Sequence, residues 1–422
     1  MIRPPSLDPL RERPFRLLFT GRTLSGIGDA VVPIALTFAV LKHGSATDLG
    51  VVLGCEWGAR VLFLLAGGVW ADRLPRQLVM IGADALRAAV QALVAASLFL
   101  HTIRIWQFAA AAALLGLGSS FFNPASTGLV PSIVSPTRLQ EANALLGLSR
   151  SAVQVAGPAL SGLLIATLGF GTVFAIDAAS FVASLVCLIA MRLPTRTTTE
   201  RPRQSTLVEA LEGLRAVRER RWIVAALSAD LVFNFCFAAY FVLGPVVVER
   251  HFDGARDWGL IMTAASIGSV AGGAAVLRFK PRRPLRIAYL FSFVMPLQLL
   301  ALAPPLPLAA LLIGSAAVFG NVTVMNTYWV TMEQQHVPRH LISRVDSLSW
   351  IASLLVMPLG LTLVGPLAAA VGTHATLIAA ALLAAASSVA VLAVRDIREL
   401  ERLDETPAEP QALPASAAAP RS

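Results

Sequence analysis

Charged side chains inside long apolar stretches are the residues of this sequence best placed to do chemistry. Asp29 lies about 14 residues into the first apolar stretch, and Asp230 lies near the equivalent height of the seventh. Glu56 and Arg60 are four residues apart in the second stretch, on one face of a helix, where they can pair. Arg150 lies about ten residues into the fifth stretch and requires an acidic partner, for which we expect Asp29 or Glu56.

The chemistry open to these groups is proton exchange or the binding of a cation. A charge at the centre of an apolar span costs at least about 2.5–3.5 kcal/mol, so it normally has a partner or a function. We expect Asp29, Glu56, Arg60, Arg150 and Asp230 to be candidates for proton coupling. Two alternatives stay open for Asp29: it binds a cationic substrate, or it is a structural acid buried inside the helix bundle. The Glu56 and Arg60 pair has a structural alternative as well.

Residues for enzymatic or metal chemistry are not arranged in a usable pattern. The six histidines fall in loops or at the ends of apolar stretches, and His336 and His340 have only Glu333 as a nearby acid. The three cysteines lie inside apolar stretches and are typical of small core residues. There is no G-x-x-x-x-G-K-[ST] loop for nucleotide phosphates. We expect no catalytic residue, no metal and no cofactor, which disfavours a membrane enzyme.

The elements that must position these side chains are membrane-spanning helices. Of 422 residues, 56% are hydrophobic and 14% are charged, whereas about a quarter of a soluble domain is charged. A helix needs about 20 apolar residues to cross a bilayer. The sequence therefore predicts an all-α membrane protein with twelve transmembrane helices in two pseudo-symmetric six-helix bundles. The expected spans are 15–41, 50–71, 78–100, 105–128, 140–167, 171–192, 222–247, 256–279, 285–303, 306–330, 346–371 and 374–394.

These spans divide the chain into five parts. They are a cytoplasmic N-terminal tail (1–14), an N-terminal six-helix bundle (15–192), a cytoplasmic linker (193–221), a C-terminal six-helix bundle (222–397) and a cytoplasmic disordered tail (398–422). In the linker, Leu207, Leu211, Leu214 and Val217 recur at helical spacing, which predicts an amphipathic helix on the membrane surface. A solvated connector with partial helix is the alternative.

Basic residues are sorted strongly between the two sides of these spans. With a cytoplasmic N-terminus, cytoplasmic loops, tails and span ends carry 29 of the 34 Lys and Arg residues, and outer loops carry four. This asymmetry predicts an even number of spans with both termini in the cytoplasm. It also explains the net charge of +9 without a nucleic-acid partner.

The two halves resemble each other weakly at a constant offset. The loop after the fourth span contains Pro136 and the loop after the tenth contains Pro338, an offset of 202 residues. Asn123 falls beside Asn326 at nearly the same offset. Duplicated six-helix halves are typical of transporters whose substrate site lies at the interface between them.

The strongest local motif lies between the second and third spans. It reads Gly68-Val-Trp-Ala-Asp72-Arg73-Leu-Pro75-Arg76-Gln77. This stretch resembles the G-x-x-x-D-R-x-G-R-R/K loop of the major facilitator superfamily, with Pro75 in place of Gly and Gln77 in place of a basic residue. The resemblance implies a cytoplasmic gating loop in which Asp72 pairs across the seam between the halves. We expect Asp84 and Arg87 to join the charged residues of this loop. The alternative is a basic loop whose positive charge only sets the orientation of the neighbouring helices in the membrane.

Further stretches resemble the macrolide-efflux and enterobactin-exporter branch of that superfamily. They are Phe15-Arg16-Leu17-Leu18, Ser25-Gly-Ile-Gly28-Asp29, Phe174-Ala-Ile-Asp177-Ala-Ala-Ser180-Phe181 and Glu212-Gly213-Leu214. Gly157-Pro158 with Gly162 resembles the G-P-x-x-G element of drug antiporters, and an ordinary proline kink is the alternative. If this element is present, it favours export over import.

Polar residues cluster in the first, fourth, seventh and tenth spans, which the resemblance implies line a central cavity. The candidates for substrate contacts are Ser25, Asn123, Asn234, Asn321, Asn326, Tyr328 and Trp329. Hydrogen bonding between helices is the alternative role of each one.

The function expected from these features is secondary active transport by alternating access. We expect proton-coupled export of an amphipathic small molecule, such as an antibiotic, siderophore or other secondary metabolite. An importer or permease for a small metabolite is the alternative, and a non-transporting sensor is disfavoured because no receptor domain is recognisable. The expected partners are a small-molecule substrate, protons and the lipid bilayer, for a monomer in a bacterial inner or plasma membrane.

Overall fold

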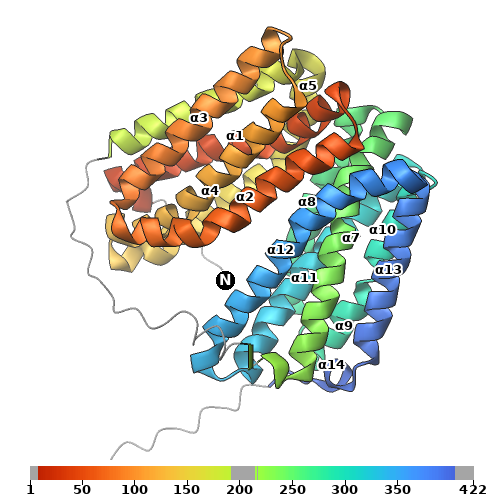
Figure 1. The fold of residues 1–422 in the computed structure, drawn as a ribbon. Coiled ribbons are helices and arrows are strands. Elements are labelled where there is room, and N and C mark those ends of the chain that lie inside the picture. The colour runs from red at the N-terminus through yellow and green to blue at the C-terminus, as the bar shows by residue number, and fades with distance from the viewer. Residues whose placement is uncertain (1–7, 192–213, 216, 404–422) are drawn as a thin grey trace, which may run out of the picture.

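A computed structural model describes residues 8–191, 214–215 and 217–403. Within these ranges it leaves out the side chains of residues 64–73, 136, 339–340, 343–344 and 346–354. The described chain is built from helices joined by short turns, arranged as two groups that contact each other (Figure 1).

The first group contains six membrane crossings in five continuous helices. They are α1 (Arg13–His43), α2 (Ala46–Arg73), α3 (Arg76–Phe99), α4 (Ile105–Ile133) and α5 (Leu139–Ile189), with short turns of 3-10 helix, η1 (Asp8–Arg11) and η2 (Pro136–Arg138). The 51-residue helix α5 is interrupted at Gly169, where φ is 76° and ψ is 170°. Glycine adopts this positive φ without steric penalty, so α5 turns there and supplies both the fifth and the sixth crossing.

The second group also contains six crossings, one of which is broken. Its helices are α7 (Arg221–His251), α8 (Gly254–Arg278), α9 (Pro284–Phe291), α10 (Val294–Leu302), α11 (Leu308–His336), α12 (Arg339–Val371), α13 (Thr373–Ala393) and the short α14 (Arg395–Glu399). Helices α9 and α10 follow each other through Ser292 and Phe293 and together form one crossing.

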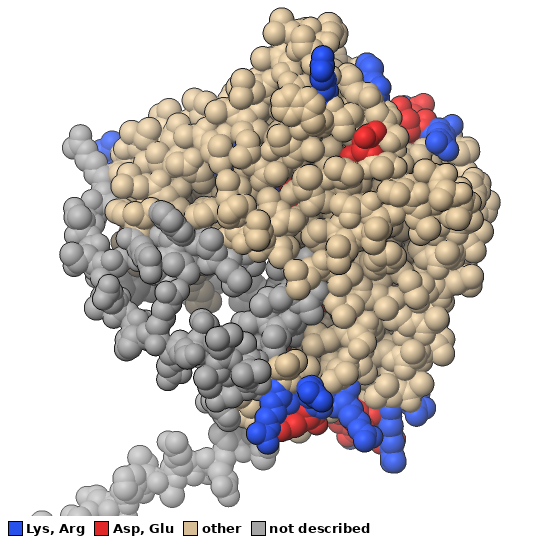
Figure 2. Space-filling view, in the orientation of Figure 1, with Lys and Arg blue, Asp and Glu red and all other residues tan. Residues whose placement is uncertain are grey.

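The surface of the described residues suits a bilayer. Nine stretches of described helix, counting α9 and α10 as one, are long and apolar enough to cross a membrane, and α12 contributes a shorter apolar stretch. In Figure 2 most of the charged side chains gather at the upper edge and at the bottom of the molecule, and the surface between them is mainly uncharged. Large apolar side chains are highly exposed in both helix groups, among them Leu277, Leu62, Ile313 and Leu93. These features confirm the predicted all-α membrane protein with about twelve helices.

The two groups are joined by close helix contacts at one end of the molecule. We call this the distal end; it carries the turns after α1, α7 and α12 and lies opposite the start of α1 and the end of α13. Gly162 of α5 faces the main chain of Ala255 in α8, and Gly259 of α8 faces the carbonyl of Pro158. Since a Cβ atom at Gly259 would lie 2.7 Å from that carbonyl oxygen, the close approach requires glycine.

A second seam joins α2 to α12 in the same way. A Cβ atom at Gly50 would overlap the main-chain carbonyl of Leu361, and one at Gly54 would overlap the side chain of Thr362. Phe38 of α1 also belongs to the buried apolar cluster of the second group. The groups therefore meet at the distal end, and their helices diverge toward the opposite end in Figure 1.

Parts of the predicted domain division fall on residues that the structure leaves out. Most of the expected linker helix, including Leu207 and Leu211, lies outside the described residues, as does the expected tail from residue 404. Residues 398–403, which we placed in that tail, are ordered: α14 extends to Glu399, and the backbone N–H of Leu403 donates to Gln335. These residues therefore belong to the packed chain.

Candidate functional site

Arg87, near the middle of α3, is the centre of a buried charge cluster in the first helix group. Its guanidinium donates a hydrogen bond to Asp84 one turn away and lies 3.7 Å from a carboxylate oxygen of Asp29 in α1. The rings of Phe122 and Phe181 enclose the guanidinium, with centroids 4.4 and 4.3 Å away. Only 4% of the Arg87 side chain is exposed, so two acids and two aromatic faces together replace its hydration.

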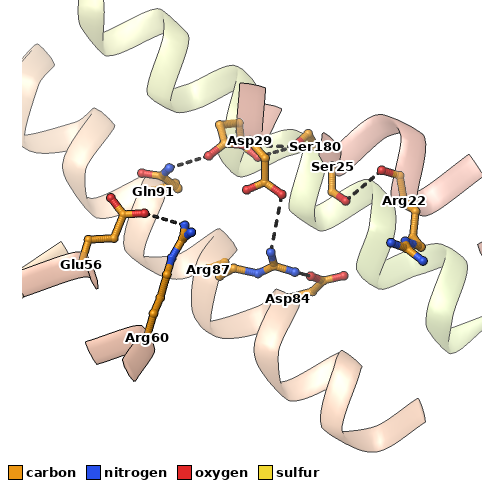
Figure 3. Close-up of polar contacts among 10 residues, drawn as sticks. Arg22, Ser25, Asp29, Glu56, Arg60, Asp84, Arg87, Gln91 and Ser180 are labelled. Atoms are coloured by element: carbon orange, nitrogen blue, oxygen red, sulfur yellow. Dashed lines mark hydrogen bonds and ion pairs between the residues drawn. The ribbon is translucent and has the colours of Figure 1, made fainter. Parts of the chain in front are cut away.

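The two acids that contact Arg87 differ in exposure. The Asp84 side chain is fully buried, whereas 52% of the Asp29 side chain is exposed. Asp29 therefore has a partner inside the helix group, while part of its side chain remains accessible. Arg87 connects an accessible carboxylate on α1 to an enclosed carboxylate on α3 (Figure 3).

Asp177, in the sixth crossing, is a third acid beside this cluster. The side-chain amide of Gln91 donates to one carboxylate oxygen of Asp177, and the Ser180 hydroxyl lies 3.3 Å from the other. A Cβ atom at Gly28 would overlap the Asp177 carboxylate, so α1 passes directly over it. Our predicted site residues did not include Asp177, although its stretch carried the branch resemblance; its contact with the residue next to Asp29 becomes visible only in the tertiary structure.

Glu56 and Arg60 form the ion pair that their spacing predicts, at 2.6 Å. The Arg60 guanidinium also lies 5.4 Å from the centroid of the Trp57 ring. Figure 3 places this pair beside Asp29 and Arg87, on the neighbouring helix α2.

One expectation about an arginine partner was wrong. Arg150 forms no ion pair with Asp29 or Glu56; its side chain is exposed, and those acids pair with Arg87 and Arg60 instead. Arg87 faces Asp29 and Asp84, and the expected link of this pair to Asp72 falls on a side chain outside the described residues. Helical spacing indicates pairs within one helix, but it contains no information about which residue of another helix lies opposite.

The predicted gating loop is described only in part, because the side chains of Gly68, Asp72 and Arg73 lie outside the described set. Pro75 precedes the first residue of α3, and the Arg76 guanidinium donates to the carbonyl of Gly128 in α4. These contacts fix the start of α3 against its neighbour.

Gln77, which departs from the family motif, binds the end of the sixth crossing. Its amide nitrogen donates to the carbonyls of Leu188 and Met191, at 2.6 and 2.7 Å. The Leu188 carbonyl also accepts from the backbone N–H of Met191, so Gln77 adds a second donor there and supplies a donor to Met191 just beyond the helix.

The Gly157, Pro158 and Gly162 motif lies where three helices approach closely. A Cβ atom at Gly157 would overlap Ala30 of α1, while Gly162 faces α8. The hydroxyl of Ser161 donates to the carbonyl of Val31. The motif thus brings α1, α5 and α8 together near the cluster that contains Asp29.

The second helix group contains a cavity of about 410 Å³. Its polar lining includes four of the predicted residues: Asp230, Asn234, Asn321 and Asn326. Trp329, also predicted, lines it together with Phe233, Phe237, Tyr289, Ser292, Met295, Ser387 and Ser388. The sequence analysis did not identify this aromatic contribution, because regularly spaced aromatic residues in an apolar helix are equally typical of core packing.

Three other predicted cavity residues lie elsewhere. Tyr328 is buried, and its hydroxyl donates to the carbonyl of Phe279. Ser25 is buried in α1 and contacts the carbonyl of Arg22, and Asn123 is exposed on α4. These residues do not line the cavity of the second group.

The arrangement offers no metal chemistry within the part of the chain that the structure describes. No group of three or more His, Cys, Asp or Glu side chains gathers there in a way that could hold an ion. What the described geometry provides is a charge cluster in one helix group and an apolar cavity in the other.

Comparison of the sequence with known proteins finds relatives over nearly the whole chain. The multidrug efflux pump Tap of Mycolicibacterium fortuitum is 28% identical over 410 residues, which cover 93% of this chain and 98% of the relative. Macrolide efflux protein A of Streptococcus pyogenes is 22% identical over 393 residues, covering 92% and 97%.

Comparison of the structure finds the same fold in solved transporters. The nucleoside transporter NupG matches with a TM-score of 0.75 at 11% identity, covering 91% of this chain and 99% of that one. A bacterial homologue of the human lysosomal transporter Spinster, in an inward-facing and unoccupied conformation, matches with a TM-score of 0.72 at 14% identity, covering 95% and 100%. The family model described as Major Facilitator Superfamily matches residues 18–361, and the chain is accordingly a member of the major facilitator superfamily, whose members are transporters and not enzymes.

Proposed function

We propose that this transporter exports an amphipathic small molecule in exchange for protons. The observation that carries the proposal is Arg87, held between the accessible Asp29 and the enclosed Asp84. Together with Asp177, Glu56 and Arg60, the cluster contains four carboxyl groups and two guanidinium groups. An unpaired charge is costly in such a site. Because the carboxyl groups outnumber the guanidinium groups, the cluster is suited to hold protons on its carboxyl groups.

Asp29 is the residue best placed to load and release the proton. Its side chain is half exposed, so it can exchange protons with water, and its 3.7 Å ion pair with Arg87 is looser than the contact between Arg87 and Asp84. Protonation of Asp29 removes its attraction to Arg87, while Asp84 keeps the guanidinium paired. Since α1 contacts α5 at Gly157 and α5 contacts α8 at Gly162, a shift of α1 can reach the seam between the helix groups.

The direction of transport is part of the same proposal. The similarity to proteins named as efflux pumps supports export, and the closed distal seams support a state that opens at the opposite end. We place both termini in the cytoplasm of a bacterial cell, as the distribution of basic residues indicates.

Accumulation in everted membrane vesicles tests this function. Vesicles that contain the protein should accumulate a macrolide or another amphipathic compound when respiration acidifies their interior, and a protonophore should abolish the accumulation. Import is supported instead if right-side-out vesicles accumulate the compound and everted vesicles do not. Accumulation that survives the protonophore would refute proton coupling.

We also propose that the loop from Gly68 to Gln77 acts as a latch at the cytoplasmic side. Asp72→Asn should slow turnover several-fold and leave substrate binding intact, because the latch holds one access state and does not contact substrate. Rapid-filtration transport and equilibrium binding on the same preparation separate the two effects. Normal turnover would remove the latch role of Asp72.

A further inference from the structure

Asp177 is an enclosed acid in the sixth crossing, the second half of α5. Only 1% of the residue is exposed. Helix α1 lies against it at Gly28, and α3 lies against it at Gln91. Helix α4, which also packs on this crossing, carries no charged residue. The charged side chains in the central turns of α1 and α3 are Arg22, Asp29, Asp84 and Arg87.

The described residues supply no cation to this acid. No arginine, lysine or histidine among them forms an ion pair with Asp177, and Arg87 pairs with Asp29 and Asp84 instead. The contacts of the Asp177 carboxyl group come from two uncharged side chains, Gln91 and Ser180 (Figure 3). Asp177 therefore differs from the other two acids, each of which faces the guanidinium.

The hydrogen bonds around the Asp177 carboxyl group leave a place for one proton. The Ser180 hydroxyl donates to the main-chain carbonyl of Asp177 at 2.7 Å, and a hydroxyl has a single proton to donate. The same hydroxyl oxygen lies 3.3 Å from the carboxyl oxygen Oδ1. A proton on Oδ1 completes this contact, with the serine oxygen as its acceptor.

The second carboxyl oxygen also fits a neutral acid. Oδ2 accepts from the side-chain amide of Gln91, and Gln91 is itself 1% exposed. An ionised carboxylate has about four acceptor sites, and one amide donor leaves most of them without a partner. Because a buried charge without compensation is strongly unfavourable, the neutral carboxylic acid suits this environment better than the carboxylate.

Helix α1 covers the carboxyl group at Gly28. A Cβ atom at Gly28 would overlap both a carboxyl oxygen of Asp177 and the hydroxyl oxygen of Ser180. The main chain of α1 therefore lies directly on these two groups and keeps water from them. Asp29 is the next residue of α1, so a shift of this helix that alters the pair of Asp29 with Arg87 also alters the cover over Asp177.

We propose that Asp177 is a second proton-binding site, which holds a proton while α1 lies against it and releases that proton to water when α1 moves away. The O–H bond at Oδ1 breaks, the proton passes to water, and the remaining carboxylate keeps the hydrogen bond from Gln91. The role of this site in transport rests on the proposed function and deepens it. The binding of the proton itself can be measured without any transport.

Infrared spectroscopy of purified protein in lipid bilayers tests the inference, because a protonated carboxyl group absorbs in a region of its own above the amide bands. At neutral pH the wild type should show a carboxylic acid band that Asp177→Asn lacks. Asparagine has nearly the same shape as the neutral acid, so this variant should fold. Gln91→Met should move the band to higher frequency, because the carboxyl C=O loses its donor. Asp253→Asn is the control: this acid is exposed and pairs with Arg256, so the band should be unchanged.

A pH titration of the same band tests the cover provided by α1. In Gly28→Ala the added methyl group pushes α1 away from the carboxyl group. The band should then disappear roughly one pH unit lower than in the wild type, because partial hydration stabilises the carboxylate. Gly26→Ala is the matched control on the same helix, since a Cβ atom there would lie 3.9 Å from its nearest neighbour, in Val153. Its titration should follow that of the wild type.

The outcomes separate this inference from the proposed function. The inference is overturned if Asp177→Asn keeps the wild-type band at neutral pH, or if Gly28→Ala titrates as Gly26→Ala does, even where export remains proton-driven. If the band belongs to Asp177 and depends on Gly28, but vesicles show no proton-driven export, the proton site stands and the export function fails.

Discussion

At the scale of single residues, the side chain that most constrains the charge cluster is Arg87. Its guanidinium holds acids from α1 and α3 and lies between two aromatic rings. Removing one partner of a buried ion pair costs about 3–5 kcal/mol, because the other charge remains buried without compensation. The arginine therefore has a structural as well as a coupling role.

We predict that Arg87→Met lowers the thermal stability of the purified protein, because it leaves Asp84 enclosed without its cation. The double variant Asp84→Leu with Arg87→Met should recover part of the loss. Arg256→Gln is the control, since the pair of Arg256 with Asp253 is exposed and should contribute less than about 1 kcal/mol. Melting temperatures in one detergent provide the comparison; equal values for Arg87→Met and Arg256→Gln would contradict this role.

The sequence predicted the interactions of these residues only where both partners lie on one helix. The spacing of Glu56 and Arg60 was sufficient to indicate their pair. The contact of Arg87 with Asp29 depends on how α1 and α3 pack, and Asp177 reaches the cluster only because Gly28 lets α1 approach closely. The exposure of Asp29 likewise depends on packing around it, which a single sequence does not specify.

At the scale of helices, the sequence predicted where the helices lie better than it predicted where a helix is interrupted. Hydrophobic stretches located the helices within a few residues, since bilayer thickness fixes their length. The predicted spans 140–167 and 171–192 left a short break around Gly169, where α5 bends, but the pattern did not indicate that the crossing from 284 to 302 is broken beside the cavity. The break in that crossing depends on local backbone conformation and not on apolar content.

Gln77 links two of these helices and permits a specific prediction. Gln77→Leu should increase hydrogen exchange of backbone amides in residues 184–191, because two carbonyls at the end of α5 lose donors worth about 1 kcal/mol each. Gln77→Lys should exchange nearly as slowly as the wild type, because lysine keeps a donor at this position. Identical exchange in the leucine and lysine variants would show that the amide contacts do not hold this end.

At the scale of the whole molecule, two seams hold the helix groups together at the distal end. Each depends on glycines that allow main chains to touch, in α2 against α12 and in α8 against α5. Contacts of this kind can separate at Gly50 and Gly259 themselves, because a glycine has no side chain to withdraw. We expect these seams to open when the transporter changes its access state.

Enlarging one seam glycine should shift the balance between access states. Gly50→Leu would collide with the Leu361 carbonyl, and such overpacking costs about 1–3 kcal/mol, so the open distal state should become more populated. Spin labels at Ser45 and His374, in a background without the native cysteines, should report a longer distance. The control is Gly58→Leu on the same helix, where an added Cβ meets no atom within 4 Å. An unchanged distance distribution in Gly50→Leu would argue against a gating seam.

The central claim is that Asp29 couples proton movement to export, and one reconstitution measures it directly. Proteoliposomes containing Asp29→Asn should exchange labelled for unlabelled substrate at a rate close to that of the wild type, because the helix groups can still move. The same vesicles should fail to accumulate substrate against its gradient when a pH gradient is imposed. Accumulation by Asp29→Asn equal to that of the wild type would contradict the account.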